Sequence, residues 1–150
     1  MEFFNIMLHT HSGLRWIALI LLLWAIFNAV SKKSSGIYTP ADRKLNMFAM
    51  VSMHLQLVIG LILYFISPNV KVALANMGAA MKNTMLRHVS VEHIIMMLIA
   101  IVLITIGHAK SKRLTDANAK HRKIFLFYTI GLLIILAAIP WPFRGFGHWF

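Results

Sequence analysis

Residues 89–109 read VSVEHIIMMLIAIVLITIGHA, an apolar run that decides the fold of the chain. Its length matches the roughly 20 residues that a helix needs to cross the hydrocarbon of a bilayer. Similar apolar runs occupy residues 13–31, 45–66 and 124–139. The four runs predict an all-α fold, a four-helix transmembrane bundle in which residues 1–150 form a single integral-membrane domain.

The overall composition agrees with a membrane protein. Of the 150 residues, 59% are hydrophobic, and the mean hydropathy is +0.74. A soluble domain of this length has too little interior to bury so much apolar surface. The chain contains no cysteine, which excludes disulfides, iron–sulfur clusters and thiolate zinc sites. Any cofactor must therefore be held by other side chains.

The net charge of +11 is concentrated in two of the three connections between the runs. These cations are Lys32, Lys33, Arg43 and Lys44 in the first connection, and Lys110, Lys112, Arg113, Lys120, Arg122 and Lys123 in the third. Because positive charge accumulates in cytoplasmic loops, we expect both termini on the outer, periplasmic side of a bacterial inner membrane. These loops should contact anionic lipid headgroups, which argues against nucleic acid as a partner. His108 and His121 share this basic boundary, where we expect both to be solvated.

The connections carry further signals. Pro40 and Asp42 are placed to start the second helix. Between residues 67 and 87, apolar side chains recur at helical spacing and predict a short helix on the outer surface. Trp141 and Trp149 are typical of the aromatic belt at a membrane interface. The spans and short connections leave no room for an extramembrane domain.

Histidines are the main chemistry-bearing side chains at these runs. A helix rises about 1.5 Å per residue, so depth can be counted from the basic end of each helix. The count places His11 roughly 31 Å, His88 roughly 33 Å and His93 roughly 25 Å from that end. His54 comes to only roughly 15 Å, near the bilayer midplane. We therefore expect His11 to lie close to the level of His93, and His54 to lie apart.

Haem b is the cofactor that best fits this arrangement. Two neutral imidazoles from facing helices ligate its iron without adding charge to the hydrocarbon. His11 and His93 are the matched pair, whereas ligation by His54 requires one helix to shift or tilt by about two turns. Arg15, one turn deeper than His11, is placed to bind a haem propionate through its forked guanidinium. The alternative is that these histidines form hydrogen bonds between helices.

Glu92 is the one acid within the apolar runs, and it adjoins His93. A charged carboxylate at this depth needs a partner. Because Arg15 is expected at a similar height, an Arg15–Glu92 ion pair between the first and third helices is one interpretation. The other makes Glu92 a proton acceptor at an outward-facing quinol site, or the group that orients a ligand histidine.

The methionines suggest a different class of function. Met47, Met50 and Met53 recur every three residues and lead into His54. Thioethers together with imidazole suit Cu(I), so a copper or small-solute permease is chemically possible. Methionine is also an ordinary space-filling residue in apolar helices.

Four segments carry a resemblance: HSGLRW at 11–16, HLQLVIGLILY at 54–64, EH at 92–93 and IPWPF at 139–143. They resemble segments of a family of small four-span membrane proteins from Bacteroidetes that are known as cytochrome b-like. The resemblance covers nearly the whole chain and implies b-type haem and electron transfer. The positions that match the family motifs are His11, Arg15, His54, Gln56 and His93.

These observations favour a non-enzymatic or accessory b-type cytochrome. It would pass electrons between quinol and a partner near the outer surface, within a larger membrane complex or as a homo-oligomer. A haem-free scaffold or assembly factor is the alternative, and a copper or small-solute permease is the third hypothesis. The sequence contains no phosphate-binding loop, no Ser/His/Asp set and no paired carboxylates, so it gives little support for a hydrolase or an ATP-driven pump.

Overall fold

The computed structural model describes residues 2–145, and every regular element in that part of the chain is helical. Four helical segments there are long and apolar enough to cross a membrane, namely α1 (Glu2–Lys32), α2 (Pro40–Ile66), Thr84–Arg113 and α7 (Ala117–Ala138). The predicted all-α class and the four membrane-length helices are thereby confirmed. Trp149, assigned above to the aromatic belt, lies outside the described residues.

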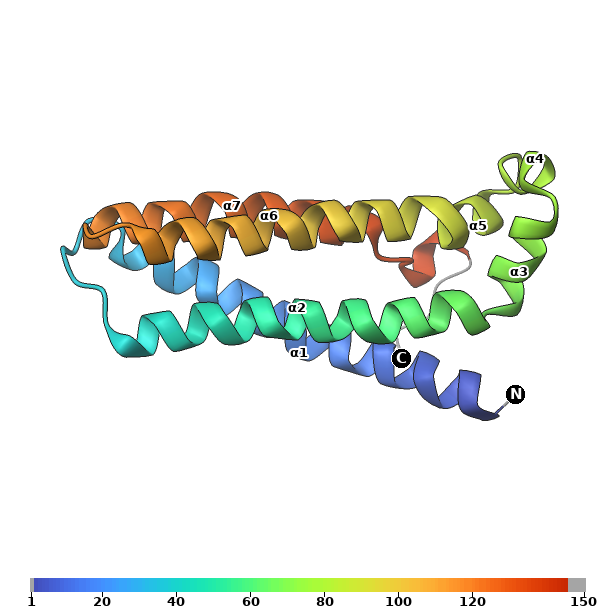
Figure 1. The fold of residues 1–150 in the computed structure, drawn as a ribbon, viewed down its shortest axis with the longest axis horizontal. Coiled ribbons are helices and arrows are strands. Elements are labelled where there is room, and N and C mark those ends of the chain that lie inside the picture. The colour runs from blue at the N-terminus through green and yellow to red at the C-terminus, as the bar shows by residue number, and fades with distance from the viewer. Residues whose placement is uncertain (1, 146–150) are drawn as a thin grey trace.

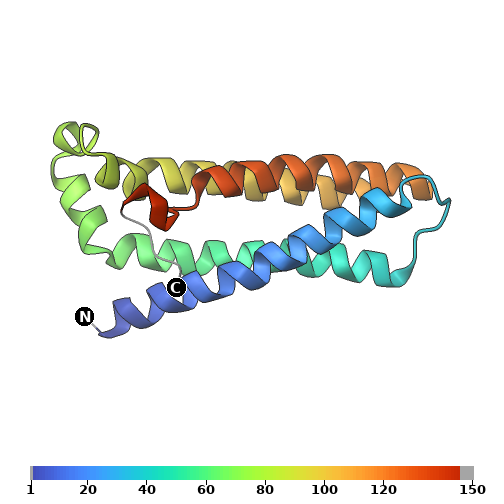
Figure 2. The same cartoon turned by 180° about the vertical axis from the view of Figure 1, so that it is seen from behind.

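Successive long helices run in opposite directions between the two ends of the molecule (Figure 1). The segment Thr84–Arg113 consists of α5 (Thr84–Arg87), a short π-helix η1 (His88–Glu92) and α6 (His93–Arg113). Helix α1 packs on α2 and α7, while α6 packs on α7 and α2, so each long helix has two long neighbours. Helix α1 crosses the bundle obliquely, as the reverse view shows (Figure 2).

The first helix is longer than its apolar run predicted. Helix α1 begins at Glu2 rather than near residue 13, so His11 lies within the helix and not before it. No proline precedes residue 13, and a single glycine is tolerated inside a helix, so nothing in this stretch ends the helix. The side chains of Phe3 and Ile6 are more than half exposed in this extension.

The connection between α2 and α5 is itself helical. It contains α3 (Pro68–Ala75) and α4 (Met77–Ala80), so the short helix predicted between residues 67 and 87 is present as α3. Each short helix starts at a side-chain cap, and these caps are Ser67, Asn76 and Asn83. Val70 and Ala73 of α3 are buried, whereas Val72 and Leu74 are exposed. Helix α3 therefore has one face against the bundle and one apolar face outward.

Small side chains let the long helices approach closely. In α1, Ala18, Leu22, Ala25 and Ala29 recur at helical spacing and are almost completely buried. Between α6 and α7, Gly107 and Gly131 have the same effect, because a Cβ atom at either position would collide with the opposite helix. Close packing of α6 against α7 thus depends on these two glycines.

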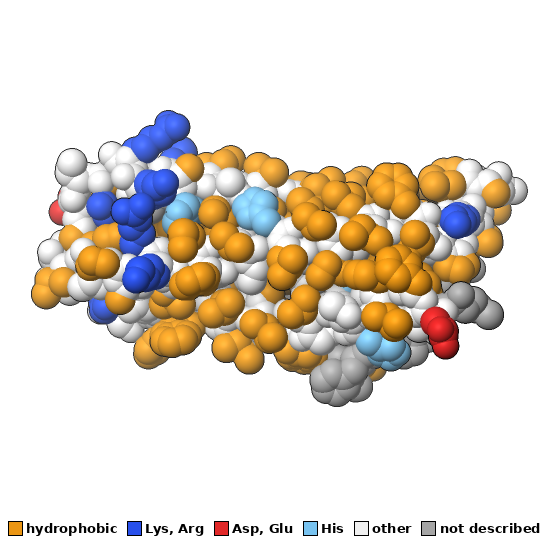
Figure 3. Space-filling view, turned by 60° about the horizontal axis from the view of Figure 1, so that its bottom comes forward, with side chains coloured by type: hydrophobic (Ala, Val, Ile, Leu, Met, Phe, Trp, Pro, Cys, Tyr) orange, Lys and Arg blue, Asp and Glu red, His pale blue; other side chains and the backbone are white. Residues whose placement is uncertain are grey.

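The two ends of the bundle differ in character. Lys and Arg side chains gather at one end of the molecule, and apolar side chains cover much of its length (Figure 3). We call this end, where α1 meets α2 and α6 meets α7, the basic end. The opposite end contains His11, His88 and His93, and we call it the histidine end.

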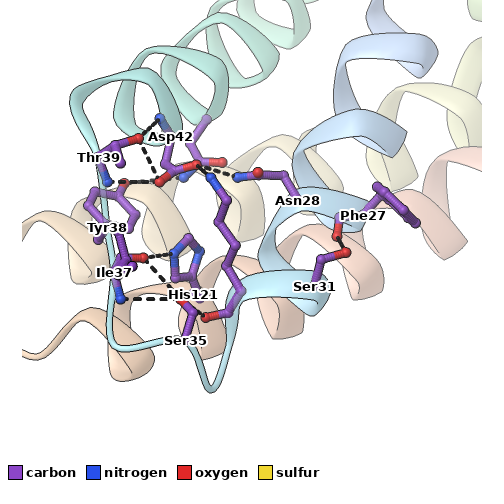
Figure 4. Close-up of polar contacts among 11 residues, drawn as sticks. Phe27, Asn28, Ser31, Ser35, Ile37, Tyr38, Thr39, Asp42 and His121 are labelled. Carbon is purple, nitrogen blue, oxygen red and sulfur yellow. Dashed lines mark hydrogen bonds and ion pairs between the residues drawn. The ribbon is translucent and has the colours of Figure 1, made fainter.

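A buried carboxylate organises the start of α2 at the basic end (Figure 4). Asp42 is 2% exposed, and its Oδ1 accepts hydrogen bonds from Lys32 Nζ at 2.7 Å and from Asn28 Nδ2 at 2.8 Å. Its Oδ2 accepts from the backbone N–H and the hydroxyl of Thr39, both at 2.8 Å. Thr39 is the N-cap of a capping box, and Pro40 occupies the first helical position. The predicted start of this helix at Pro40 and Asp42 is confirmed.

The turn between α1 and α2 is fastened to α7 by buried polar groups. His121 donates its Nε2–H to the carbonyl of Ile37 at 2.9 Å, and the Tyr128 hydroxyl donates to the carbonyl of Asn46 at 2.7 Å. His121 is 0% exposed and His108 is 8% exposed. The prediction that both histidines are solvated is therefore wrong. The connection between α1 and α2 folds over α7, and both histidine side chains lie inside the helix packing.

We expect Asp42→Ala to lower the free energy of unfolding by about 2–3 kcal/mol, because several hydrogen bonds and a helix cap are lost together. The matched control is Asp116→Ala, which removes a single exposed N-cap bond to the backbone of Ala119 and should cost about 1 kcal/mol. Unfolding titrations of the two variants in mild detergent measure the difference. Equal losses would contradict the role given to Asp42.

Candidate functional site

A cavity of about 520 Å³ lies at the histidine end between α1, α2 and the Thr84–Arg113 segment. Its volume falls in the range of small-molecule and cofactor sites, which are mostly apolar with a few convergent polar groups. The polar residues of the lining are His9, His11, Ser12, Arg15, Gln56, Tyr64, Ser67, Asn69, His88 and His93. The remainder of the lining is mainly leucine, isoleucine and methionine. The depth count thus identified a level of the bundle at which a cavity exists.

His93 is held in one ring orientation. Its Nδ1 lies 2.9 Å from the carbonyl oxygen of Ala138, so Nδ1–H is the donor. This bond links the start of α6 to the last turn of α7. In a neutral imidazole, donation from Nδ1 leaves Nε2 as the nitrogen that can accept a hydrogen bond or ligate a metal. Metal-ligating histidines usually have such a bond on the other nitrogen.

His11 and His93 both line the cavity, and their rings meet edge to face. The two ring centroids are 6.4 Å apart with planes inclined at 78°, which confirms the prediction that these residues lie close to one level. Gly60 makes room for the His11 ring, because a Cβ atom at residue 60 would lie 3.3 Å from Cε1 of His11. Nδ1 of His11 is buried and finds no hydrogen-bond partner within residues 2–145.

Gln56 connects the first two helices at the same level. Its Nε2 donates to the backbone carbonyl of His11 at 3.1 Å. Its Oε1 is buried and, like the His11 Nδ1, has no partner in the described part of the chain. Two residues from two helices that line one cavity therefore each have a buried polar atom without a partner in residues 2–145, which is unusual in a native interior and calls for an explanation.

A π-turn brings His88 to the same site. In a regular α-helix, residues five apart lie about 140° apart around the axis. In η1 the N–H of His93 bonds instead to the carbonyl of His88, five residues earlier. The two rings consequently come to 6.0 Å between centroids. Single π-turns occur frequently at functional sites, and no sequence signal pointed to this one.

The π-turn is supported from α2. The hydroxyl of Tyr64 donates to the backbone carbonyl of Ser90 at 3.0 Å, and the hydroxyl of Ser90 donates to the carbonyl of Leu86 at 2.6 Å. These bonds satisfy backbone oxygens where the regular i→i+4 pattern is interrupted. Tyr64, which also lines the cavity, thus helps to fix the geometry of this turn.

Glu92 has partners within its own helical segment. Its Oε1 accepts from Nε of Arg87 at 2.6 Å, and its Oε2 lies 3.2 Å from Nδ1 of His88. The predicted Arg15–Glu92 ion pair is therefore wrong. The π-turn sets Glu92 on the same side as Arg87, where its side chain is 39% exposed.

Arg15 lines the cavity from α1 and contacts two indoles. Its guanidinium carbon lies 5.3 Å from the ring centroid of Trp16 and 6.0 Å from that of Trp141. Such cation–π contacts hold a guanidinium in place at a water–apolar boundary. The arrangement keeps a positive charge beside the cavity, one helical turn from His11.

His54 lies apart from the cluster, as the depth count predicted. Its Nδ1–H donates to the carbonyl of Met50 at 3.0 Å, and its Nε2 lies 3.2 Å from the hydroxyl of Thr105. Both ring nitrogens are thus engaged, and the side chain links α2 to α6. His54 does not line the cavity.

The chain can be assigned to a class by fold and site. It is a bundle of four membrane-length helices with a histidine-lined cavity at one end. In residues 2–145 no group of three or more His, Asp or Glu side chains is placed to hold a bare metal ion. A haem iron, by contrast, requires no more than two protein ligands. No protein-family model, no curated protein and no solved structure matches the chain.

Proposed function

We propose that the chain is a b-type haem protein whose histidine end holds one haem b between His11 and His93. The observation that supports this most directly is that the His93 ring, fixed by its bond to Ala138, lies beside the ring of His11, whose buried Nδ1 has no partner in residues 2–145. When bound, haem supplies reversible one-electron chemistry. The chain then serves as an electron carrier or accessory respiratory subunit rather than as an enzyme.

The separation of the two rings fits two ligands of one metal. Metal–imidazole bonds are roughly 2 Å long, so two imidazoles that share a metal have ring centres roughly 6 Å apart. The His11 and His93 centroids are 6.4 Å apart. His88 is equally near His93, but both side chains come from one helical turn and so do not face each other across the cavity. His11 and His93 come from opposing helices.

The remaining lining suits a flat apolar group with an acidic edge. Leu19, Met53, Leu57 and Met97 provide apolar contacts around the cavity. Arg15 offers a forked donor for a carboxylate of the macrocycle, and its two indole contacts keep it beside the cavity. The residues present therefore fit haem b.

His88 and Glu92 provide a route for protons beside the same cavity. His88 lines the cavity and is 2% exposed, whereas the Glu92 side chain is 39% exposed. Oxidation of a quinol releases protons together with electrons, so a quinol-facing carrier benefits from an acceptor pair that reaches the surface. We assign this role to His88 and Glu92, with Arg87 stabilising the carboxylate.

Orientation in the membrane follows from charge. Because positive charge accumulates on the cytoplasmic side, we propose that the basic end faces the cytoplasm of a bacterium and that the histidine end, with both termini, faces the periplasm across the inner membrane. A larger membrane complex, or a second copy of the chain, is the partner we propose for the exposed apolar surface.

The second candidate function is a haem-free scaffold or assembly factor. Two histidines favour it, because His54 and His121 engage backbone or hydroxyl groups of neighbouring elements and act as structural links. If His11 and His93 do the same in the membrane, no cofactor is needed. A copper or small-solute permease has less support, since the methionines before His54 lie mostly outside the cavity.

A difference spectrum separates these functions. The protein purified in mild detergent should show the sharp α-band of a six-coordinate b-type haem in the reduced-minus-oxidised spectrum, and a pyridine haemochrome assay should give about one haem per chain. Expression with added haem precursor removes cofactor supply as a variable. A featureless spectrum under that condition would contradict the haem proposal and leave the scaffold as the better account.

A further inference from the structure

A second, smaller pocket lies at the basic end. Its volume is about 110 Å³, and it is lined by Tyr38, Arg43, Lys112 and Lys120. Tyr38 lies in the connection between α1 and α2, whereas the three cations come from α2, α6 and the start of α7. Three helices and this connection therefore meet at the pocket. A water molecule occupies about 30 Å³ of liquid, so the pocket has room for a few waters or one tetrahedral oxyanion.

One side of the pocket is built on buried residues. Asn46, which is 0% exposed, donates from Nδ2 to the hydroxyl of Tyr38 at 3.2 Å. The ring of Tyr38 lies 5.0 Å from that of His121, which is also completely buried. The ammonium of Lys120 lies 4.9 Å from the Tyr38 ring centroid. Tyr38 and Lys120 are therefore held in position by the fold.

The charges of the pocket are not neutralised by the protein. Within residues 2–145, none of its three cations forms an ion pair with a carboxylate. The two nearest acids along the chain are engaged elsewhere: Asp42 binds Lys32, and Asp116 caps the start of α7. Like charges brought together repel each other unless an anion joins them. The chemistry of the site therefore calls for an anion.

We propose that this pocket binds the phosphate group of an anionic phospholipid. Arginine and lysine between membrane helices are suited to lipid phosphate. A lipid is the favoured source because the exposed side chains of Met47 and Val51 follow Arg43 at four-residue intervals along the same face of α2. Acyl chains can cover this apolar stripe while the phosphate occupies the pocket. The site is separate from the proposed haem cavity.

The test measures the thermal unfolding midpoint of the full chain in mild detergent with added phosphatidylglycerol. Phosphatidylcholine and inorganic phosphate are added in parallel, so that headgroup charge and free anion are separated. The pocket variant is Lys112→Gln with Lys120→Gln. Its matched control is Arg113→Gln with Arg122→Gln, which removes the same charge from the same two helices at positions that do not line the pocket. Lys112→Gln alone serves if the double variant does not fold.

We expect phosphatidylglycerol to raise the midpoint of the parent and of the control, with at least about a tenfold higher lipid concentration needed for the pocket variant. Phosphatidylcholine should have no comparable effect. Equal weakening in both double variants would overturn the proposal, because only total charge would then matter. Stabilisation by inorganic phosphate as strong as that by the lipid would overturn the lipid as the source.

Discussion

His93→Ala is expected to abolish the haem spectrum. The substitution removes an imidazole that lines the cavity, together with the bond from its Nδ1 to the carbonyl of Ala138. Under the proposal, the substitution removes one of the two imidazoles that would hold the haem, so we expect a loss of affinity well above tenfold, where tenfold corresponds to about 1.4 kcal/mol. The α-band of the reduced protein and the haem content per chain provide the measurement. His11→Ala should show the same loss, because His11 is the second ligand that we propose.

The matched control is His54→Ala, which removes a histidine that also lies in a membrane-length helix but does not line the cavity. Its haem spectrum should remain, with only a small loss of stability from the bonds to Met50 and Thr105. A chemical rescue separates ligation from folding: imidazole added to His93→Gly should restore the α-band. Retention of the full spectrum in His93→Ala would rule out the assigned ligand, whatever the stability of the variant.

Counting residues along the helices was sufficient to predict that His11 and His93 lie at a similar level of the bundle. This worked because the long helices all extend between the same two ends of the bundle (Figures 1 and 2), and each count starts at the end marked by cations. The same count separated His54 correctly. Hydropathy predicted the four helices for an equally simple reason, since about 20 apolar residues have few alternatives to a membrane-length helix.

The π-turn, the partner of Glu92 and the burial of His121 depend on tertiary contacts and could not be predicted from the local sequence. The π-turn at 88–92 is stabilised by Tyr64 from another helix, so its own residues do not reveal it. Because that turn rotates Glu92 towards Arg87, the expected partner Arg15 was wrong. The burial of His121 likewise depends on a carbonyl of the first turn, far away in sequence.

Gly107→Ala is expected to have the largest effect on stability of any single methyl addition in the bundle. A Cβ atom at residue 107 would overlap the Cβ of Phe127 and lie 3.0 Å from its Cγ. The Phe127 Cβ is fixed to the backbone of α7 and cannot rotate away, so α6 and α7 must separate. We expect a loss of about 3 kcal/mol in the free energy of unfolding, at the upper end of the usual cost of overpacking.

Gly13→Ala is the matched control, because nothing lies within 4 Å of a Cβ atom at residue 13. An alanine inside a helix is favoured over glycine by about 0.5–1 kcal/mol, so this variant should be neutral or slightly more stable. Unfolding titrations in mild detergent compare the two. A Gly107→Ala protein as stable as the parent would show that α6 and α7 are not packed as closely as described.

The same packing reaches the candidate site through α7. Gly131 lies two turns before Ala138, and a Cβ atom there would be 2.7 Å from Cγ1 of Ile104. Gly131→Ala therefore displaces the part of α7 whose last carbonyl orients His93. We expect this variant to lose about 2 kcal/mol of stability and also to broaden or weaken the α-band. Gly107→Ala lies at the far end of α6 and should lower stability with little change in the spectrum of the folded fraction. A spectrum affected equally by both substitutions would mean that the Ala138 carbonyl does not set the orientation of His93.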